Sequence, residues 1–165
     1  MEKYTSYPDS SPVRSCEETL SGANASALDT RMRALFNEAL KAAALAYAPY
    51  SKFHVGAALL ADDGTVYTGC NVENRSFGLT ICAERSAVVQ AVSKGRRSFV
   101  ALAIAAPDSE TPVGPCGACR QVLSEFMAPD APVRFGGSGP EQVSTTIGAL
   151  YPYDSLHELA ASLRQ

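Results

Sequence analysis

Two short stretches, Thr80-Ile-Cys-Ala-Glu-Arg-Ser86 and Pro115-Cys-Gly-Ala-Cys119, decide how this chain has to fold. Together they offer three thiols and one carboxyl group. In the first stretch a single residue separates Cys82 from Glu84, and in the second the two cysteines lie one helical turn apart. Three cysteine ligands leave one position of a tetrahedral Zn²⁺ ion open, which is typical of a catalytic zinc site. We therefore expect a fold that brings the two stretches together around one Zn²⁺ ion per chain.

The carboxyl group of Glu84 distinguishes this site from the alternatives. An open zinc site can hold a water molecule and lower its pKa to about 7. Glu84 would be the proton carrier that such a water needs. The pair Cys116 and Cys119 alone is also found in redox-active dithiols and in structural zinc sites, and a structural site needs a fourth ligand. The candidates for that fourth ligand are Cys70, His54 and His157.

The charge of the cluster has to be balanced. Cys82 and Cys116 are each expected at the start of a helix, where free N–H groups and the helix dipole favour a thiolate. Three thiolates on one Zn²⁺ ion form a negative cluster, which is a poor Lewis acid. Arg85 and Arg120, next to the cysteines in the sequence, are the candidates for returning positive charge, and either could instead be an ordinary surface arginine.

Composition narrows the class of protein. The 165 residues suit one domain, and 46% apolar residues can form an ordinary globular core. The net charge of −3 argues against a nucleic-acid partner, and no apolar run is long enough to span a bilayer. The N-terminus has no apolar segment of the kind found in signal peptides, and the cysteine count is odd. We expect a reduced, cytoplasmic protein without a disulfide framework.

The order of expected elements predicts an α/β fold. Residues 1–27 are polar and aperiodic, so we expect a mobile tail followed by one catalytic domain over residues 28–165. Asp29 or Thr30 is expected to cap a helix that reaches Tyr47. The elements expected next are strands over 53–61 and 66–71 joined by a hairpin turn, a helix over 82–94, a strand over 99–106, a helix over 116–126, strands over 133–136 and 145–150, and a helix over 156–164. Such an order indicates a mixed sheet with helices packed on it.

Four stretches in the right order resemble the small, three-cysteine class of cytidine deaminases. They are Cys82–Arg85, Pro115–Gln121, Tyr47–Ala58 and Gly69–Asn74. The order C-x-E and then P-C-x-x-C is the zinc-deaminase signature, here with Cys in the place of His. The resemblance covers about residues 30 to 153. It implies a three-layer α-β-α sandwich, in which a five-stranded mixed sheet has helices on both faces, and a zinc-dependent homotetramer.

The resemblance also implies a reaction and a role for each site residue. The reaction is hydrolytic deamination of cytidine and 2′-deoxycytidine to uridine and 2′-deoxyuridine with release of ammonia, as in pyrimidine salvage. Glu84 would take a proton from the attacking water, protonate ring nitrogen N3 and pass a proton to the departing amine. Arg85 would offset the thiolate charge. The implied zinc ligands are Cys82, Cys116 and Cys119. The implied substrate contacts are Phe53 against the base, Ala83 at the pyrimidine edge, and Asn71 and Glu73 at the ribose hydroxyls.

The C-terminal region departs from the family pattern. The family commonly has a Phe there that closes the site of a neighbouring subunit, whereas Ser155 stands near that position here. Either Tyr153 substitutes for it or the pocket is more open. We expect Phe77, together with Tyr153 if it substitutes, to reach across subunits. Other functions remain open, namely deamination of an aminonucleoside antibiotic of the blasticidin type, editing of nucleic acid, or a zinc-stabilised interaction module without catalysis. The ribose motif over residues 71–74 favours the nucleoside, and the acidic balance disfavours nucleic acid.

Overall fold

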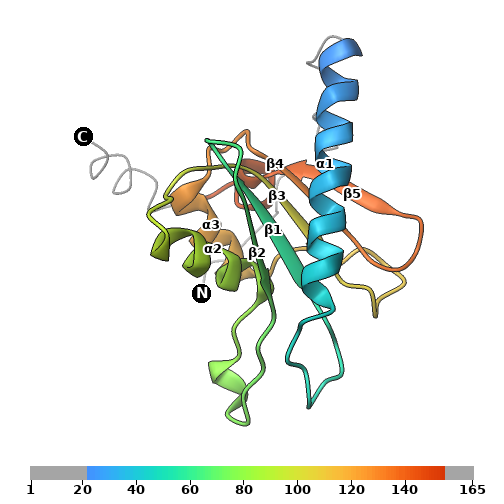
Figure 1. Cartoon of the computed structure of the whole chain (residues 1–165), viewed down its shortest axis with the longest axis vertical. Helices are drawn as coiled ribbons and strands as arrows, with labels where there is room; N and C mark the ends of the chain where they lie inside the picture. The colour runs from blue at the N-terminus through green and yellow to red at the C-terminus, as the bar shows by residue number, and fades with distance from the viewer. Residues whose placement is uncertain (1–21, 155–165) are drawn as a thin grey trace, which may run out of the picture.

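A computed structural model describes residues 22–154 and shows a twisted sheet between layers of helices (Figure 1). The elements in chain order are α1 (Gly22–Ala43), β1 (Gly56–Ala61), β2 (Val66–Cys70), the 3₁₀ turn η2 (Phe77–Leu79), α2 (Ala83–Ser93), β3 (Phe99–Ala105), α3 (Gly117–Phe126), β4 (Pro132–Gly136), β5 (Gln142–Thr146) and α4 (Ile147–Leu150).

The sheet is mixed, with strand order β2-β1-β3-β4-β5. β3 and β4 run parallel, and the other neighbouring pairs are antiparallel. α1 packs on one face of the sheet, and α2 and α3 pack on the other. The expected three-layer α/β sandwich is therefore confirmed.

Strand β1 lies between β2 and β3 and is buried along its whole length. Its alternate side chains enter two separate cores. Ala57 and Leu59 pack with α2 and α3, whereas Ala58 and Leu60 pack with α1. The continuous apolar sequence of β1 is explained by this burial on both faces.

Two glycines let the helices approach the sheet closely. A Cβ atom on Gly56 would lie 1.9 Å from the backbone oxygen of Ala39 in α1. A Cβ atom on Gly69 would lie 2.3 Å from the backbone nitrogen of Ala87 in α2. No side chain fits at either position. Gly69 thus fixes how deeply α2, the helix that follows Cys82, sits on β2.

Some expected boundaries are wrong. α1 begins at Gly22, so the expected cap at Asp29 or Thr30 and the expected end of the tail at residue 27 both fall inside the helix. The expected strand over 145–150 ends at Thr146, because the Thr146 hydroxyl accepts a hydrogen bond from the Ala149 N–H at 3.2 Å and starts α4.

The rest of the expected tail and the expected terminal helix over 156–164 lie outside the described residues. Within residues 22–154, the helices are too short or too polar to cross a membrane.

Candidate active site

Two helix N-termini bring the three expected ligands together. Cys82 is the N-cap of α2, and Cys116 is the N-cap of α3. One turn into α3, Cys119 faces the same point. The Sγ atoms of Cys82 and Cys116 are 3.8 Å apart, and all three Sγ atoms lie within 4.8 Å of one another. Tetrahedral Zn²⁺ with Zn–S bonds of about 2.3 Å requires sulfurs about 3.8 Å apart, so the cluster fits zinc.

The alternative fourth ligands do not complete this cluster. The Cys70 thiol donates to the Leu45 carbonyl oxygen at 3.4 Å and lies outside the group of three. The ring nitrogen Nδ1 of His54 pairs with Asp108 at 2.7 Å. His157 lies outside the described residues. Among the residues described, the protein supplies three ligands, which is the number that leaves a position open for a water or a substrate.

Arg85 supplies the positive charge beside the sulfurs. Its terminal nitrogen donates to Cys82 Sγ at 3.4 Å and to the Thr80 carbonyl oxygen at 3.3 Å. Arg85 Nε is buried and has no hydrogen-bond partner among the described residues. A hydrogen bond from Cys119 and then the Arg85 guanidinium lower the pKa of Cys82 to about 5. The hydrogen bond to Cys82 and burial raise the pKa of Cys119.

Arg120, the other arginine candidate, has a different position. Its Nε donates to the Pro115 carbonyl oxygen at 2.8 Å, and one terminal nitrogen donates to the Leu150 carbonyl oxygen at 3.1 Å. These bonds tie the segment before Cys116 to the end of α4. Arg120 therefore holds the backbone of the site, whereas Arg85 bonds to a sulfur.

Glu84 is a buried acid in the first turn of α2, with 4% of its surface exposed. Burial raises the pKa of its carboxyl group, and the charge on Cys82 raises it further. A carboxyl group whose pKa is raised toward neutrality can both accept and return a proton, as a general acid–base catalyst must.

Most of the expected site residues line one cavity of about 420 Å³. This volume lies in the range of pockets for small organic molecules. The expected residues that line it are Phe53, Asn71, Glu73, Cys82, Ala83, Glu84 and Cys116. The cavity is also lined by residues for which the sequence predicted no individual role, namely Ser51, Val55, Thr80, Ile104, Val113 and Gly114.

The two residues expected at the ribose also hold the wall of the cavity. Asn71 accepts from the Val55 N–H and donates to the Phe53 carbonyl oxygen, both at 2.8 Å. Glu73 accepts from the Tyr50 N–H at 2.9 Å and from the Ser51 hydroxyl. That hydroxyl, ahead of the other hydrogen bonds, lowers the pKa of Glu73 and keeps it ionised. These contacts were not predicted, although residues 47–58 and 69–74 were singled out as motifs.

The two expected cross-subunit residues do not line the cavity. Phe77, in η2, is 74% exposed and Tyr153 is 84% exposed. The Phe77 ring meets the ring of Tyr50 edge to face, with centroids 5.8 Å apart. Phe77 therefore stands beside the turn that carries Ser51, outside the cavity of its own chain.

A family comparison agrees with this geometry. The protein-family model for the cytidine and deoxycytidylate deaminase zinc-binding region matches residues 29–134 of this chain. This chain belongs to that deaminase family. The cysteine cluster accordingly lies within a zinc-binding deaminase region, and zinc is the cofactor of the family.

Similar proteins support the assignment to the deaminase family. The chain is 54% identical over 118 residues to a cytidine deaminase of Sporosarcina psychrophila, covering 72% of this chain and 86% of the relative. A crystal structure of cytidine deaminase from Burkholderia pseudomallei is 45% identical with a TM-score of 0.70, covering 73% of this chain and 96% of that one. A blasticidin-S deaminase of Bacillus cereus is 36% identical over 109 residues, covering 62% of this chain and 76% of the relative.

Proposed function

We propose that this protein catalyses the hydrolytic deamination of cytidine and 2′-deoxycytidine, forming uridine and 2′-deoxyuridine and releasing ammonia, a reaction of pyrimidine salvage. The observation that carries this proposal is that one cavity is lined by the buried Glu84, by Cys82 and Cys116 of the cysteine cluster, and by Asn71 and Glu73. It combines a proton carrier, a metal centre and polar groups suited to a sugar.

The three sulfurs would hold Zn²⁺, which when bound supplies Lewis acidity and an activated water. Glu84 takes one proton from the attacking water and delivers it to ring nitrogen N3 of the pyrimidine. The water oxygen forms the new bond to C4 in this first stage. Glu84 then takes the second water proton from the new C4–OH group and passes it to the departing amine, so that the C4–N4 bond breaks as C4=O forms. One water and one cytidine then give one uridine and one ammonia. The raised pKa of the buried Glu84 suits this two-way proton transfer.

The remaining site residues bind and orient the nucleoside. Asn71 and Glu73 have lone pairs and N–H groups beyond those they use on the wall, and we assign these to the ribose hydroxyls. Phe53 lies on the cavity wall for the base to pack against, and the backbone near Ala83 borders the pyrimidine edge. The Arg85 guanidinium bonds to Cys82 and reduces the negative charge of the cluster.

A panel of substrates tests this proposal. Zinc-loaded protein should convert cytidine and 2′-deoxycytidine to equal amounts of deaminated nucleoside and ammonia. Blasticidin S and a cytosine-containing oligonucleotide should react far more slowly, because neither presents a free ribose to Asn71 and Glu73. Faster turnover of blasticidin S than of cytidine would support the antibiotic function instead. No turnover of any compound by fully loaded protein would support the non-catalytic module.

We also propose a homotetramer in which neighbouring chains close each cavity. Several exposed apolar side chains lie on the segments next to the catalytic cavity. The backbone of Val72 forms isolated β-bridges with Tyr47 on one side and Ile81 on the other, and all three side chains are exposed. Phe77 is exposed as well, and its ring contacts the ring of Tyr50. Exposed apolar surface is typical of protein interfaces.

The test of assembly is sedimentation velocity. Wild-type protein should sediment as a tetramer, and Phe77→Glu should dissociate it and raise KM for cytidine. Tyr153→Ala should raise KM without dissociation if Tyr153 reaches into a neighbouring site. A fully active wild-type monomer would remove both residues from substrate binding. For location we propose the cytoplasm, because a reducing compartment maintains free thiols such as this cluster needs.

A further inference from the structure

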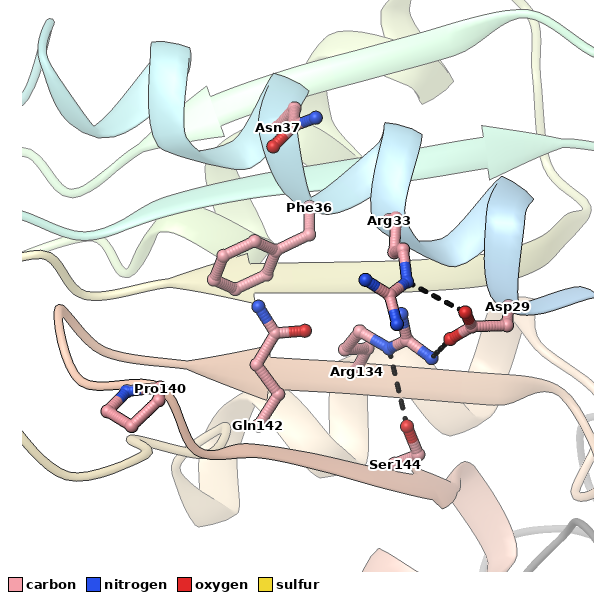
Figure 2. Close-up of a pocket in the computed structure, with 8 residues that line it drawn as sticks. All are labelled: Asp29, Arg33, Phe36, Asn37, Arg134, Pro140, Gln142 and Ser144. Atoms are coloured by element: carbon pink, nitrogen blue, oxygen red, sulfur yellow. Dashed lines mark hydrogen bonds and ion pairs between the residues drawn. The ribbon is translucent and has the colours of Figure 1, made fainter.

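A second cavity lies across the sheet from the cysteine cluster, beside α1 and the strands β4 and β5 (Figure 2). Its volume is about 490 Å³. Helix α1 provides one wall and the two strands provide the floor. The polar side chains that line it are Asp29, Arg33, Asn37, Arg134, Gln142 and Ser144.

The cavity exists because α1 covers only part of its sheet face. Small residues on β3, including Ala101 and Ala103, let α1 pack closely on β1 and β3. Beyond β3 the same face becomes polar. Arg134 pairs with Ala103 on one side and with Ser144 on the other, so the three side chains share this face. The part of the sheet face that α1 leaves uncovered forms the floor of the cavity, and Arg134 makes this floor basic.

Arg134 is buried and held by a carboxylate and a hydroxyl. It is 9% exposed, and one terminal nitrogen donates to Asp29 Oδ1 at 2.7 Å. Its Nε donates to the Ser144 hydroxyl at 3.3 Å. The other oxygen of Asp29 accepts from Arg33 Nε at 2.7 Å. One carboxylate therefore serves two guanidinium groups, which leaves one positive charge uncompensated within the cavity.

The cavity also has unused hydrogen-bonding groups. The terminal nitrogens of Arg33 donate no hydrogen bond to any described residue, and the Arg33 side chain is 74% exposed. The side-chain amides of Asn37 and Gln142, on the wall and the floor, likewise form no hydrogen bond with the residues described. Figure 2 shows Arg33 beside Arg134, with Gln142 below the Phe36 ring and Asn37 farther along α1. A ligand with an anionic end and a hydroxylated body would satisfy both kinds of group.

We propose that this cavity binds a small phosphate monoester of sugar-phosphate size, with Arg33 and Arg134 as the phosphate ligands. Guanidinium groups match phosphate oxygens in geometry and charge, and such charge-assisted bonds are among the strong hydrogen bonds of proteins. The amides of Asn37 and Gln142 face the sugar hydroxyls. The hydrogen bonds from Arg134 and Arg33 lower the pKa of Asp29, which stays ionised and competes with the phosphate.

This site is independent of the deaminase chemistry. The cysteine cluster lies on the α2 and α3 side of the sheet, whereas the phosphate cavity lies on the α1 side. The exposed apolar side chains that we assign to subunit contacts lie on segments next to the catalytic cavity, and none of them lines the phosphate cavity. Failure of phosphate binding would leave the deamination of cytidine unaffected, and the reverse also holds.

The test is isothermal titration calorimetry on the full-length, zinc-loaded protein. Ribose 5-phosphate should bind saturably with one site per chain, and ribose should not bind. Arg33→Gln should weaken binding about tenfold or more, because it removes a charge-assisted contact. Arg31→Gln, a matched loss of charge at an exposed position of the same helix outside the cavity, should bind as wild type does. Both variants should deaminate cytidine at the wild-type rate.

The variant Asp29→Asn distinguishes a phosphate site from a purely structural ion pair. A purely structural ion pair predicts only lower stability for this variant. The proposed site predicts tighter binding of ribose 5-phosphate, because the competing carboxylate is gone. The proposal is overturned by equal weakening in Arg31→Gln and Arg33→Gln, by equal affinity for succinate, by binding of inorganic phosphate without ribose 5-phosphate, or by no binding at all.

Discussion

Replacing Arg85 by alanine should slow deamination while leaving the fold intact. The change removes the donor to Cys82 Sγ at 3.4 Å and the donor to the Thr80 carbonyl oxygen at 3.3 Å. A hydrogen bond to a charged group contributes about 1.5–3 kcal/mol. If the lost bond leaves the cysteine cluster more negative and the bound metal a weaker Lewis acid, kcat should fall about 10-fold to 150-fold. Arg85→Gln retains an N–H donor without the charge and should fall between wild type and Arg85→Ala.

The assay is steady-state deamination of cytidine by each variant after zinc content is matched. The effect should appear in kcat more than in KM, because Arg85 contacts a sulfur rather than the nucleoside. Arg97→Ala, at an exposed position after α2, removes the same charge away from the site and should change neither value. A zinc-loaded Arg85→Ala variant with kcat within twofold of wild type would refute the role of Arg85 in offsetting the thiolate charge.

The other predictions concern the metal, the packing of α2 and the ribose contacts. Alanine at any of the three cluster cysteines should abolish zinc binding and turnover, whereas Cys70→Ala should keep one zinc per chain by atomic absorption; full zinc occupancy in a cluster variant would contradict the ligand set. Gly69→Ala should destabilise the protein by about 3 kcal/mol or more, because its Cβ would meet the backbone of α2, while Gly78→Ala, whose Cβ meets nothing within 4 Å, should unfold near the wild-type temperature. Asn71→Ala should raise KM for cytidine and lower thermal stability together, since Asn71 also bonds the segment at Phe53; a change in only one of the two would separate its roles.

The cysteine cluster could be predicted from the sequence because its residue types are rare and their spacing is tied to helix starts. Cys82 and Cys116 were expected at helix starts, and both prove to be N-caps. The apolar sequence of β1 likewise predicted a strand covered on both faces, as observed. In these cases a local pattern and its tertiary role agree.

The pairings of Asp29 and Glu73 with partners distant in the sequence were not predicted. Asp29 looked like a helix cap, but its partner is Arg134, 105 residues away. Glu73 was assigned to a sugar, yet its carboxylate also holds the turn at Ser51, 22 residues away. A carboxylate that caps a helix, forms an ion pair or binds a ligand can have the same neighbours in the sequence, so the sequence does not distinguish these roles. Only the packing of α1 on the sheet, or of one turn on another, decides between these roles.

The change of structure at Thr146 shows a different limit. A β-branched residue at the end of an extended segment favours a strand, and the sequence over 145–150 was read in that way. Thr146 is the last residue of β5, and its hydroxyl caps α4. The strand therefore ends where the sequence was expected to continue it, and α4 buries Ile147.

The most direct test of the deaminase assignment is to compare wild type and Glu84→Gln as zinc-loaded proteins acting on cytidine. Glu84 is not a zinc ligand, so the variant should keep one zinc per chain and the wild-type fold by circular dichroism. Loss of the proton carrier should reduce uridine formation by about 10²-fold to 10⁴-fold or more. Cytidine turnover by Glu84→Gln near the wild-type rate would contradict the account, because the buried carboxyl group beside the cysteine cluster would then have no part in the reaction.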